Sequence, residues 1–315
     1  MSNVATTISI IVPVYNEEAV LPLFFEEISA VLKPLNIVYE ILFIDDGSRD
    51  KTETILLALK SYNPEIAFVK FSRNFGKEAA MSAGLKLCKG EAAIIIDVDL
   101  QDPPALIPDM LEAWKSGADV VNMKRLIRHG EPAWKIQTAN LFYSTMSKIS
   151  EIEIPQNVGD FRLFSRCVIN SLNQLNERGR FMKGLFAWVG YSQTTIHYER
   201  DARMAGNTKW SFLKLTRFAW QGITAFSTAP LKIATWLGLM SASVAFFYAA
   251  YFLIKSLLIG DDVQGFPTLV TIILFLGGLQ LFCIGIMGEY IARIYNEVKQ
   301  RPIYLVENFH PSNTL

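Results

Sequence analysis

The 315-residue sequence contains few of the residues that build disulfides, zinc sites or histidine clusters. Its three cysteines and three histidines are all far apart in sequence: Cys88, Cys167, Cys283, His129, His197 and His310. This spacing predicts neither a disulfide framework nor a zinc site, and it is typical of a reducing compartment. The formal net charge is zero, so no excess of positive charge indicates a nucleic-acid partner.

Two nucleotide-binding fingerprints are also absent. No G-x-G-x-x-G follows the first apolar run, and no G-x-x-x-x-G-K-[ST] occurs anywhere, which excludes the common dinucleotide and P-loop classes. The N-terminus lacks a signal peptide, because the apolar run from Ile8 to Val14 is short and is followed by acids. We therefore expect the first domain to stay on the side of the membrane where it is made.

Hydrophobic residues are abundant and are concentrated after Pro230. They make up 51% of the sequence, and the mean hydropathy is +0.25. Residues 233–254 and 263–288 carry no charge, and each run is long enough to span a bilayer. The connecting loop, Ser256 to Gly265, contains Asp261 and Asp262 and no basic residue, while basic residues flank the pair of runs, so the positive-inside rule predicts cytoplasmic termini. Glycines in the second run permit close helix packing, within a hairpin or in a homo-oligomer.

The first two thirds of the chain alternates between strand and helix patterns. The predicted strands are Ile8–Val14, Tyr39–Ile44, Ile66–Phe71, Ile94–Ile96 and Asp119–Met123, and the predicted helices between them are Leu21–Leu32, Thr52–Ser61, Glu78–Lys89 and Ala105–Ser116. Strict alternation predicts an α/β fold with a mostly parallel central sheet that helices cover on both faces.

Acidic residues follow the predicted strands at the edge where open α/β sheets bind ligands. Asp97 and Asp99 come directly after Ile94–Ile96, and residues i and i+2 of an extended chain point to the same side. Two such carboxylates are a suitable seat for Mg²⁺ or Mn²⁺. The alternative is a solvated acidic corner between strand and loop. Glu17, Asp46 and Arg125 follow three other strands at the same edge.

Four motifs in order carry a resemblance to a known family. They are Val12-Pro13-Val14-Tyr15-Asn16-Glu17, Asp45-Asp46-Gly47-Ser48, Arg73-Asn74-Phe75-Gly76-Lys77-Glu78 and Asp97-Val98-Asp99-Leu100-Gln101-Asp102-Pro103-Pro104. Together with the two apolar runs, they resemble the inverting family 2 glycosyltransferases with a GT-A fold. More narrowly, the chain resembles the polyprenyl-phosphate glycosyltransferases, the group of the bactoprenol (undecaprenyl-phosphate) glucosyltransferases and dolichyl-phosphate mannose synthase.

The resemblance implies a role for each matching position. Residues implied at the nucleotide sugar are Pro13, Tyr15, Glu17, Asp46, Asp97 and Gln101, and those implied at the reacting centre are Asp99, Asp160 and Arg125. Asp99 is implied as the ligand of a divalent cation, Mg²⁺ or Mn²⁺. UDP-glucose is the implied donor and undecaprenyl phosphate the implied acceptor. GDP-mannose and a UDP-4-amino-arabinose-type donor remain alternatives.

The acceptor's chemistry decides which groups the site needs. A lipid phosphate has a second pKa near ~6, so it arrives as an anion and needs positive charge more than a base. The resemblance places Arg203 and Lys209, in the basic loop before the first apolar run, at the acceptor phosphate. Asp160 is either a base or orienting group near the reaction, or a structural residue: the N-cap of a helix over Ser165–Leu175 or a partner of Arg162.

We therefore expect a four-part chain. Residues 1–210 form the catalytic domain, 211–229 a juxtamembrane amphipathic helix, 230–291 two transmembrane helices (about 232–256 and 265–289), and 292–315 an extended cytoplasmic tail. The expected location is the bacterial inner (plasma) membrane, multi-pass, with both termini cytoplasmic. A processive polysaccharide synthase is the weaker enzyme reading, because two spans cannot enclose a polymer channel and no Q-x-x-R-W signature is present. The alternative that is not an enzyme is a non-catalytic membrane scaffold.

Overall fold

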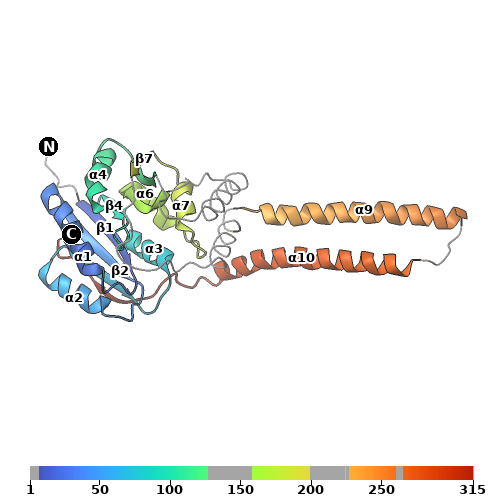
Figure 1. Ribbon diagram of the computed structural model, residues 1–315, viewed down its shortest axis with the longest axis horizontal. Helices are drawn as coiled ribbons and strands as arrows, with labels where there is room; N and C mark the ends of the chain where they lie inside the picture. Colours follow the sequence, from blue (N-terminus) through green and yellow to red (C-terminus); the bar gives the residue numbers. More distant parts are fainter. Residues whose placement is uncertain (1–6, 127–157, 199–223, 225–226, 260–264, 315) are drawn as a thin grey trace.

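A computed structural model describes residues 7–126, 158–198, 224, 227–259 and 265–314 of the chain. In the described part, a single sheet carries helices on both faces, and two long helices project from it side by side (Figure 1). This arrangement confirms the expected α/β class and a two-helix hairpin after it.

The sheet has eight strands in the order β7-β5-β6-β4-β1-β2-β3-β8. The strands are β1 Thr7–Val14, β2 Val38–Asp45, β3 Ile66–Phe71, β4 Ala92–Ile95, β5 Val120–Arg125, β6 Val158–Ser165, β7 Gln193–Tyr198 and β8 Val306–His310. The central strands β4, β1, β2 and β3 run parallel, as do β5 and β7. Strand β6 is antiparallel to β4 and β5, and β8 is antiparallel to β3. The sheet is therefore mostly parallel, as predicted, with two antiparallel strands that the alternation did not predict.

The pairing register aligns the ends of the central strands. Val14 at the end of β1 lies opposite Asp45 at the end of β2, and Ile11 lies opposite Ile95 at the end of β4. The backbone N–H of Asp46 donates to the carbonyl of Val14 at 2.9 Å, which holds the following turns together. The polar turns after β1, β2 and β4 consequently lie along one edge of the sheet.

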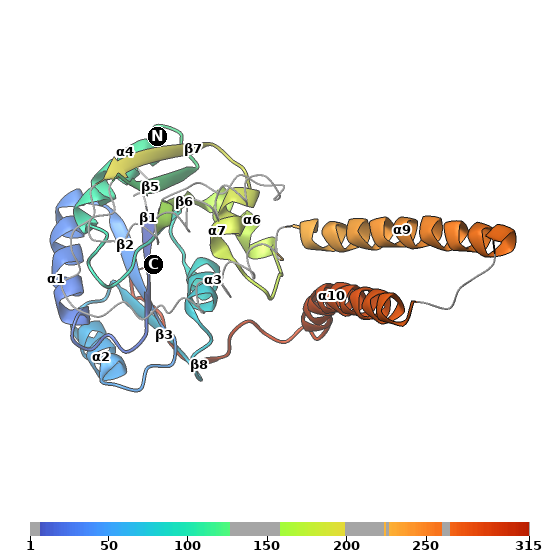
Figure 2. The same ribbon diagram turned by 45° about the vertical axis from the view of Figure 1, so that its right-hand side comes forward.

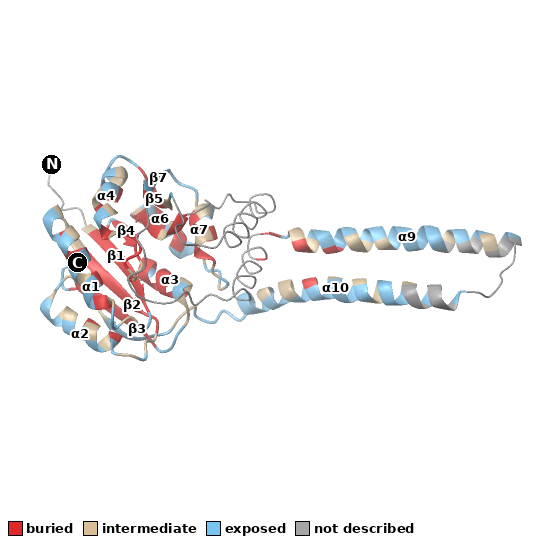
Figure 3. Ribbon diagram, in the orientation of Figure 1, coloured by how far each residue is buried: buried red, intermediate tan, exposed pale blue. Residues whose placement is uncertain are grey.

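The strand residues alternate between two hydrophobic layers because successive side chains point to opposite faces. Ile10 of β1 packs in the layer under α1 Leu21–Leu32, α2 Thr52–Tyr62 and α4 Ile107–Lys115. Ile11 packs in the opposite layer, under α3 Lys77–Leu87, α6 Arg166–Gln174 and α7 Met182–Trp188. Two short 3₁₀ turns, η1 Lys33–Leu35 and η2 Pro104–Leu106, adjoin α1 and α4. Figure 3 shows the resulting buried sheet between partly exposed helices.

The two projecting helices are α9 Ala229–Ile259 and α10 Phe266–Val298. Both contain stretches long and apolar enough to cross a membrane. Their large apolar side chains face outward: Trp236, Phe247 and Leu281 are 71%, 72% and 71% exposed. Figure 3 shows exposed residues along both helices. Apolar surface of this extent is unfavourable in water and favourable in lipid.

The C-terminal tail differs from its prediction. It was expected as an extended segment by itself, but it returns from α10 to the catalytic domain and adds β8 to the free edge of β3 (Figure 2). The rings of Tyr304 and His310 stack on Phe71 and Phe68, with centroid separations of 4.9 and 4.5 Å. A strand of five residues is too short to show a clear hydrophobic period. Its partner β3 lies over 200 residues away in sequence, so no local pattern predicts the pairing.

Candidate active site

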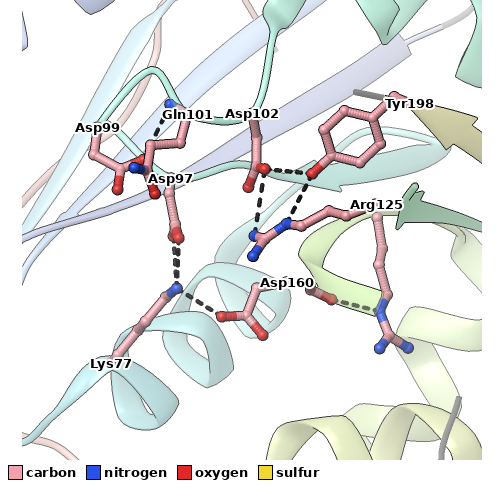
Figure 4. Close-up of polar contacts among 10 residues, drawn as sticks. Lys77, Asp97, Asp99, Gln101, Asp102, Arg125, Asp160 and Tyr198 are labelled. Carbon is pink, nitrogen blue, oxygen red and sulfur yellow. Dashed lines mark hydrogen bonds and ion pairs between the residues drawn. The ribbon is translucent and has the colours of Figure 1, made fainter. Parts of the chain in front are cut away.

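The site lies at the sheet edge after β4, in the turn that contains Asp97 and Asp99. The strand β4 ends at Ile95, and the chain then turns, with Leu100 in a left-handed conformation (φ 54°). The prediction that both carboxylates share one side of an extended strand is therefore wrong, because alternation applies only while the chain stays extended. Figure 4 shows Asp97 directed at Lys77, while Asp99 lies beside Gln101.

Lys77 joins two acids that are far apart in sequence. Its Nζ lies 2.7 Å from Asp97 Oδ1 and 2.6 Å from Asp160 Oδ2 (Figure 4). Lys77 is the first residue of α3, and Gly76 before it has φ 100°, a conformation that glycine adopts without strain. The glycine turn thus aims the lysine at the sheet edge. This motif was among those that carry the resemblance to glycosyltransferases, but no role was predicted for Lys77.

The charges of Lys77 and Asp160 are stable near neutral pH, while burial raises the pKa of Asp97. Partial burial opposes the charge on Lys77, but the carboxylates of Asp97 and Asp160 raise the pKa of its ammonium above the usual range. Burial also opposes ionisation of Asp160, yet Lys77 and Lys183 hold the pKa of this carboxyl well below its usual range. Asp160 is consequently an anion paired with a cation across the whole range in which enzymes operate.

Asp160 lies on β6 and not before a helix. The structural alternative that it caps a helix is wrong, because β6 continues to Ser165 and α6 begins at Arg166. The charge of Arg162 helps to lower the pKa of Asp160, as the alternative partner would, while the Nε of Arg162 donates to the carbonyl of Gly159 at 3.1 Å. Asp160 therefore reaches the site because β6 runs antiparallel to β4 beside it.

Arg125 belongs to a second polar cluster next to the first. Its Nη2 lies 3.4 Å from Asp102 Oδ1, and its Nε donates to the hydroxyl of Tyr198 at 3.2 Å. The Tyr198 hydroxyl donates to the same carboxylate of Asp102 (Figure 4). Arg125 was expected at the reacting centre, and in the structure its charge is balanced by the buried carboxylate of Asp102. The arginine therefore fixes the turn after Asp99, and a phosphate contact requires that this pairing be shared.

The turns after β1 and β2 hold each other in place. The backbone N–H of Glu17 donates to Thr52 Oγ1 at 3.0 Å, and Asn16 accepts the N–H of Arg49 at 2.8 Å. Between these turns the predicted nucleoside residues differ in access: Pro13 is buried and Tyr15 is 41% exposed. Tyr15 thus offers an aromatic face at the edge, while Pro13 packs in the strand.

Asp46 contacts the protein backbone. Its Oδ1 and Oδ2 accept the N–H groups of Phe75 and Gly76 at 2.6 and 2.9 Å, and only 4% of the residue is exposed. Asp46 thus has a structural role, and its expected contact with the nucleotide stays a prediction. Asp46 shapes the loop that presents Lys77.

The residues at Asp99 fit a divalent cation that takes part of its ligands from substrate. Asp99 is partly exposed, and its Oδ1 accepts the N–H of Gln101 at 3.3 Å, which orients the carboxylate. Gln101 itself is 8% exposed. Within the described ranges, no group of three or more His, Cys, Asp or Glu forms a cage for a metal. Mg²⁺ and Mn²⁺ often bind through one or two carboxylates, and substrate phosphates complete the shell.

Three further predictions concern residues that lie wholly or mostly outside the part of the chain that the structure describes. Arg203, Lys209 and nearly all of the segment 211–229 lie outside the described residues.

The functional residues that sequence reasoning missed are Lys77, Asp102 and Tyr198. Only Lys77 carried a signal, since it follows a glycine at the predicted start of a helix. The contacts of Tyr198 with Asp102 span 96 residues, and nothing local indicates them.

Two family models match the chain. The model described as "Glycosyl transferase family 2" matches residues 9–172, and the model described as "GtrB C-terminal hairpin" matches residues 229–294. The first match covers the strands and turns that build the site, and the second covers α9 and most of α10.

Several curated proteins are similar over nearly their whole length. A prophage-derived bactoprenol glucosyl transferase of Shigella flexneri is 47% identical over 308 residues, covering 97% of this chain and 99% of that protein. A prophage bactoprenol glucosyl transferase homolog of Escherichia coli is 46% identical, covering 95% and 98%. An uncharacterized glycosyltransferase of Synechocystis is 48% identical, covering 96% and 95%.

Solved structures give a weaker likeness. Glucosyl-3-phosphoglycerate synthase from Mycobacterium tuberculosis, in complex with Mn²⁺, UDP-glucose and phosphoglyceric acid, is 18% identical with a TM-score of 0.45. The match covers 70% of this chain and 77% of that one. A likeness of this degree transfers no substrate.

Proposed function

The chain belongs to glycosyl transferase family 2, and we propose that it is a membrane-bound inverting glucosyltransferase that moves glucose from UDP-glucose to undecaprenyl phosphate. The observation that carries this proposal is the pairing of a family 2 site with an attached apolar hairpin in one chain. The named relatives, nearly half identical over the full length, support both the glucose and the bactoprenol acceptor.

The cluster at Lys77 supports direct attack by the lipid phosphate. A general base works best when its pKa lies near the operating pH. The pKa of Asp160 lies far below that range, because the positive charges of Lys77 and Lys183 favour its ionised form. It is therefore a poor base and a good orienting group. A phosphate acceptor needs no general base, since it is already ionised at neutral pH. Its oxygen attacks the anomeric carbon as the bond to the nucleoside diphosphate breaks, which inverts the configuration.

The departing diphosphate needs positive charge. We assign Asp99 as the protein ligand of a divalent cation, Mg²⁺ or Mn²⁺, which when bound neutralises the developing charge on the diphosphate. Asp97 holds Lys77 beside this position at 2.7 Å. The ammonium of Lys77 supplies a second positive charge near the reaction, and its place is fixed by two ion pairs before any substrate binds.

The hairpin supports a location at the membrane surface. The helix α9 leaves the catalytic side, α10 comes back, and the tail then pairs with β3, so both ends of the hairpin lie on the same side as the site (Figure 1). With the charge distribution of the flanks, this arrangement supports cytoplasmic termini in the inner membrane. A nucleotide sugar then reaches the site from the cytoplasm and the acceptor from the bilayer.

The proposal is tested with purified protein, radiolabelled UDP-glucose and undecaprenyl phosphate, with and without EDTA. We expect a single glucolipid whose formation stops with EDTA. Parallel reactions with GDP-mannose and a UDP-4-amino-arabinose-type donor identify another sugar. A growing polymer indicates a processive synthase instead, and no product from any donor indicates a scaffold and overturns the proposal.

A further inference from the structure

A cavity of about 1080 Å³ lies between the foot of α10 and the beginning of α3. Its walls come from the loop before α3, the segment 177–181, the last turns of α10 and the first residues of the tail. This volume exceeds what a phosphate needs and is in the range of sites for larger organic ligands. None of the residues predicted for the nucleotide sugar lines it.

Three guanidinium groups on the cavity wall, those of Arg73, Arg180 and Arg301, form no ion pair within the described part of the chain, and the first two lie beside the loops that face the catalytic domain. The Arg180 Nε donates to the carbonyl of Glu177 at 3.2 Å, and its Nη2 donates to the carbonyl of Leu175. Arg73 donates to the carbonyl of Asn74 at 2.9 Å and lies 4.0 Å from the centre of the Phe75 ring. No carboxylate oxygen among the described residues lies within 4.0 Å of either group.

Two other arginines on the same wall do form ion pairs with glutamates. Arg178 lies 3.9 Å from Glu297, and Arg293 lies 3.5 Å from Glu289 one helical turn away. Partial burial of Arg180 lowers the pKa of its guanidinium, because the nearby Glu177 compensates its charge only in part. The partly buried Arg180 and the exposed Arg73 are both without an ion pair among the described residues, and such cations on one cavity wall favour an anion as the occupant.

Part of the wall is apolar, while glutamates such as Glu177 and Glu297 line the remainder. Phe181 and Ile303 line the cavity from the domain and the tail, and Ile294 and Val298 line it from α10. Since its wall includes the last turns of α10, this cavity lies at the end of the apolar hairpin that is nearest to the catalytic domain. An anion with an apolar chain matches both halves of the wall.

The cavity is also next to the reacting centre. Gly76 and Glu78 line it, and Lys77 between them contacts Asp97 and Asp160. Glu78 accepts the N–H of Met182 at 2.8 Å, which fixes the wall beside Arg180. The wall that carries Arg73 is therefore continuous with the loop that presents the catalytic lysine.

We propose that this cavity binds the phosphate monoester headgroup and first apolar units of the lipid acceptor, with Arg73 and Arg180 as its phosphate ligands. The inference rests on the proposed function, because it gives the acceptor of that reaction a binding site. Two guanidinium groups match the two negative charges of a monoester better than the single charge of a phospholipid diester.

The test compares Arg73→Met, Arg180→Met and the double variant with wild type in the full-length protein. Lys86→Met is the matched control, since Lys86 is an exposed cation at the other end of α3 and does not line the cavity. We expect each arginine variant to raise the half-saturating concentration of undecaprenyl phosphate about tenfold, the effect of losing one charge-assisted hydrogen bond. The dissociation constant of UDP is expected to stay unchanged in all variants.

Binding is measured separately by native mass spectrometry with undecaprenyl phosphate or dioleoyl phosphatidylglycerol. We expect wild type and Lys86→Met to retain undecaprenyl phosphate in preference, and the arginine variants to lose it. Equal retention of phosphatidylglycerol by wild type, with its loss in the variants, assigns the cavity to bulk phospholipid and overturns the proposal. Unchanged acceptor dependence in folded variants overturns it as well.

Two further arms keep the outcome interpretable. If Arg180→Met fails to fold, Arg73→Met on the exposed loop and the charge-preserving Arg180→Lys carry the test, with Arg180→Lys expected to retain most acceptor binding. Failure of the proposed function is a different result: wild type then makes no glycolipid from any nucleotide sugar, while the binding measurement still reports on the cavity.

Discussion

Glu78 is a buried carboxyl whose ionisation the fold opposes, and its replacement by glutamine is a sharp test of the electrostatics beside the site. Burial raises the pKa of Glu78 to about 7, although the N–H of Met182 donates to its Oε2 at 2.8 Å; the negative charge of Asp160 raises the pKa further. Glutamine has the same shape and still accepts the N–H of Met182, but it cannot ionise. The variant therefore removes one proton equilibrium and little else.

The sign of the effect follows from where each state releases its proton. The unfolded chain releases the proton of Glu78 near its ordinary value of 4.5, and the folded protein holds it to about 7. Between these values the folded state binds more protons, so wild-type stability falls as the pH rises through this window and is flat above it. A shift of this size corresponds to about 3 kcal/mol at pH 8. Glu78→Gln is thus expected to be more stable than wild type at pH 8 and equally stable below about pH 4.5.

The assay is thermal unfolding of the purified protein in detergent micelles from pH 4.5 to 9. A stabilisation of about 3 kcal/mol raises the Tm by roughly 6–12 °C for a domain of this size. Glu112→Gln, at an exposed position on α4, is the matched control and is expected to leave the pH dependence unchanged. A difference in Tm between Glu78→Gln and wild type that is the same at every pH would refute the reasoning.

Three other perturbations have defined outcomes. Asp99→Asn is expected to abolish glucolipid formation and the response to added Mg²⁺ or Mn²⁺, while far-UV circular dichroism stays unchanged; near-normal turnover counts against the cation assignment. Lys77→Met leaves the carboxylates of Asp97 and Asp160 without their shared cation and is expected to lower kcat on the order of 100-fold, with partial rescue in Lys77→Arg; equal activity in steady-state assays contradicts its role. Tyr304→Ala removes the ring stacked on Phe71 and is expected to destabilise the protein by about 2 kcal/mol, whereas an unchanged Tm shows that the tail contributes no packing energy.

The central elements of the fold could be predicted from local pattern. The helix predicted over Leu21–Leu32 and the strand over Ile66–Phe71 have those same bounds in the structure. Both segments have an unbroken hydrophobic period and clear ends, so local preference and tertiary packing agree. The strand β6 was missed because Asp160 and Arg162 interrupt its apolar run, although the pairing with β4 and β5 places both residues usefully.

The acids of the site could be located from the sequence, but their partners could not. Runs of apolar residues that end in acids identify Asp97 and Asp99 without any alignment. The pairing of Lys77 with Asp160 joins residues 83 apart, and it depends on an antiparallel strand that alternation does not predict. For the same reason the sequence did not indicate that the carboxylate of Asp46 holds the loop before α3. Sequence pattern gives the chemistry available at an edge, and the topology decides which groups meet.

The return of the tail gives the acidic motif after β2 a physical explanation. The carbonyl of Leu305 accepts the N–H of Ser72 at 3.0 Å, and Tyr304 stacks on Phe71, which contacts Phe75 edge to face at 5.8 Å. Phe75 in turn donates its backbone N–H to Asp46. The loop that presents Lys77 is therefore held from one side by the sheet and from the other by the segment that follows α10. Since α10 lies in the apolar hairpin, this double attachment fixes the position of the lysine relative to that hairpin.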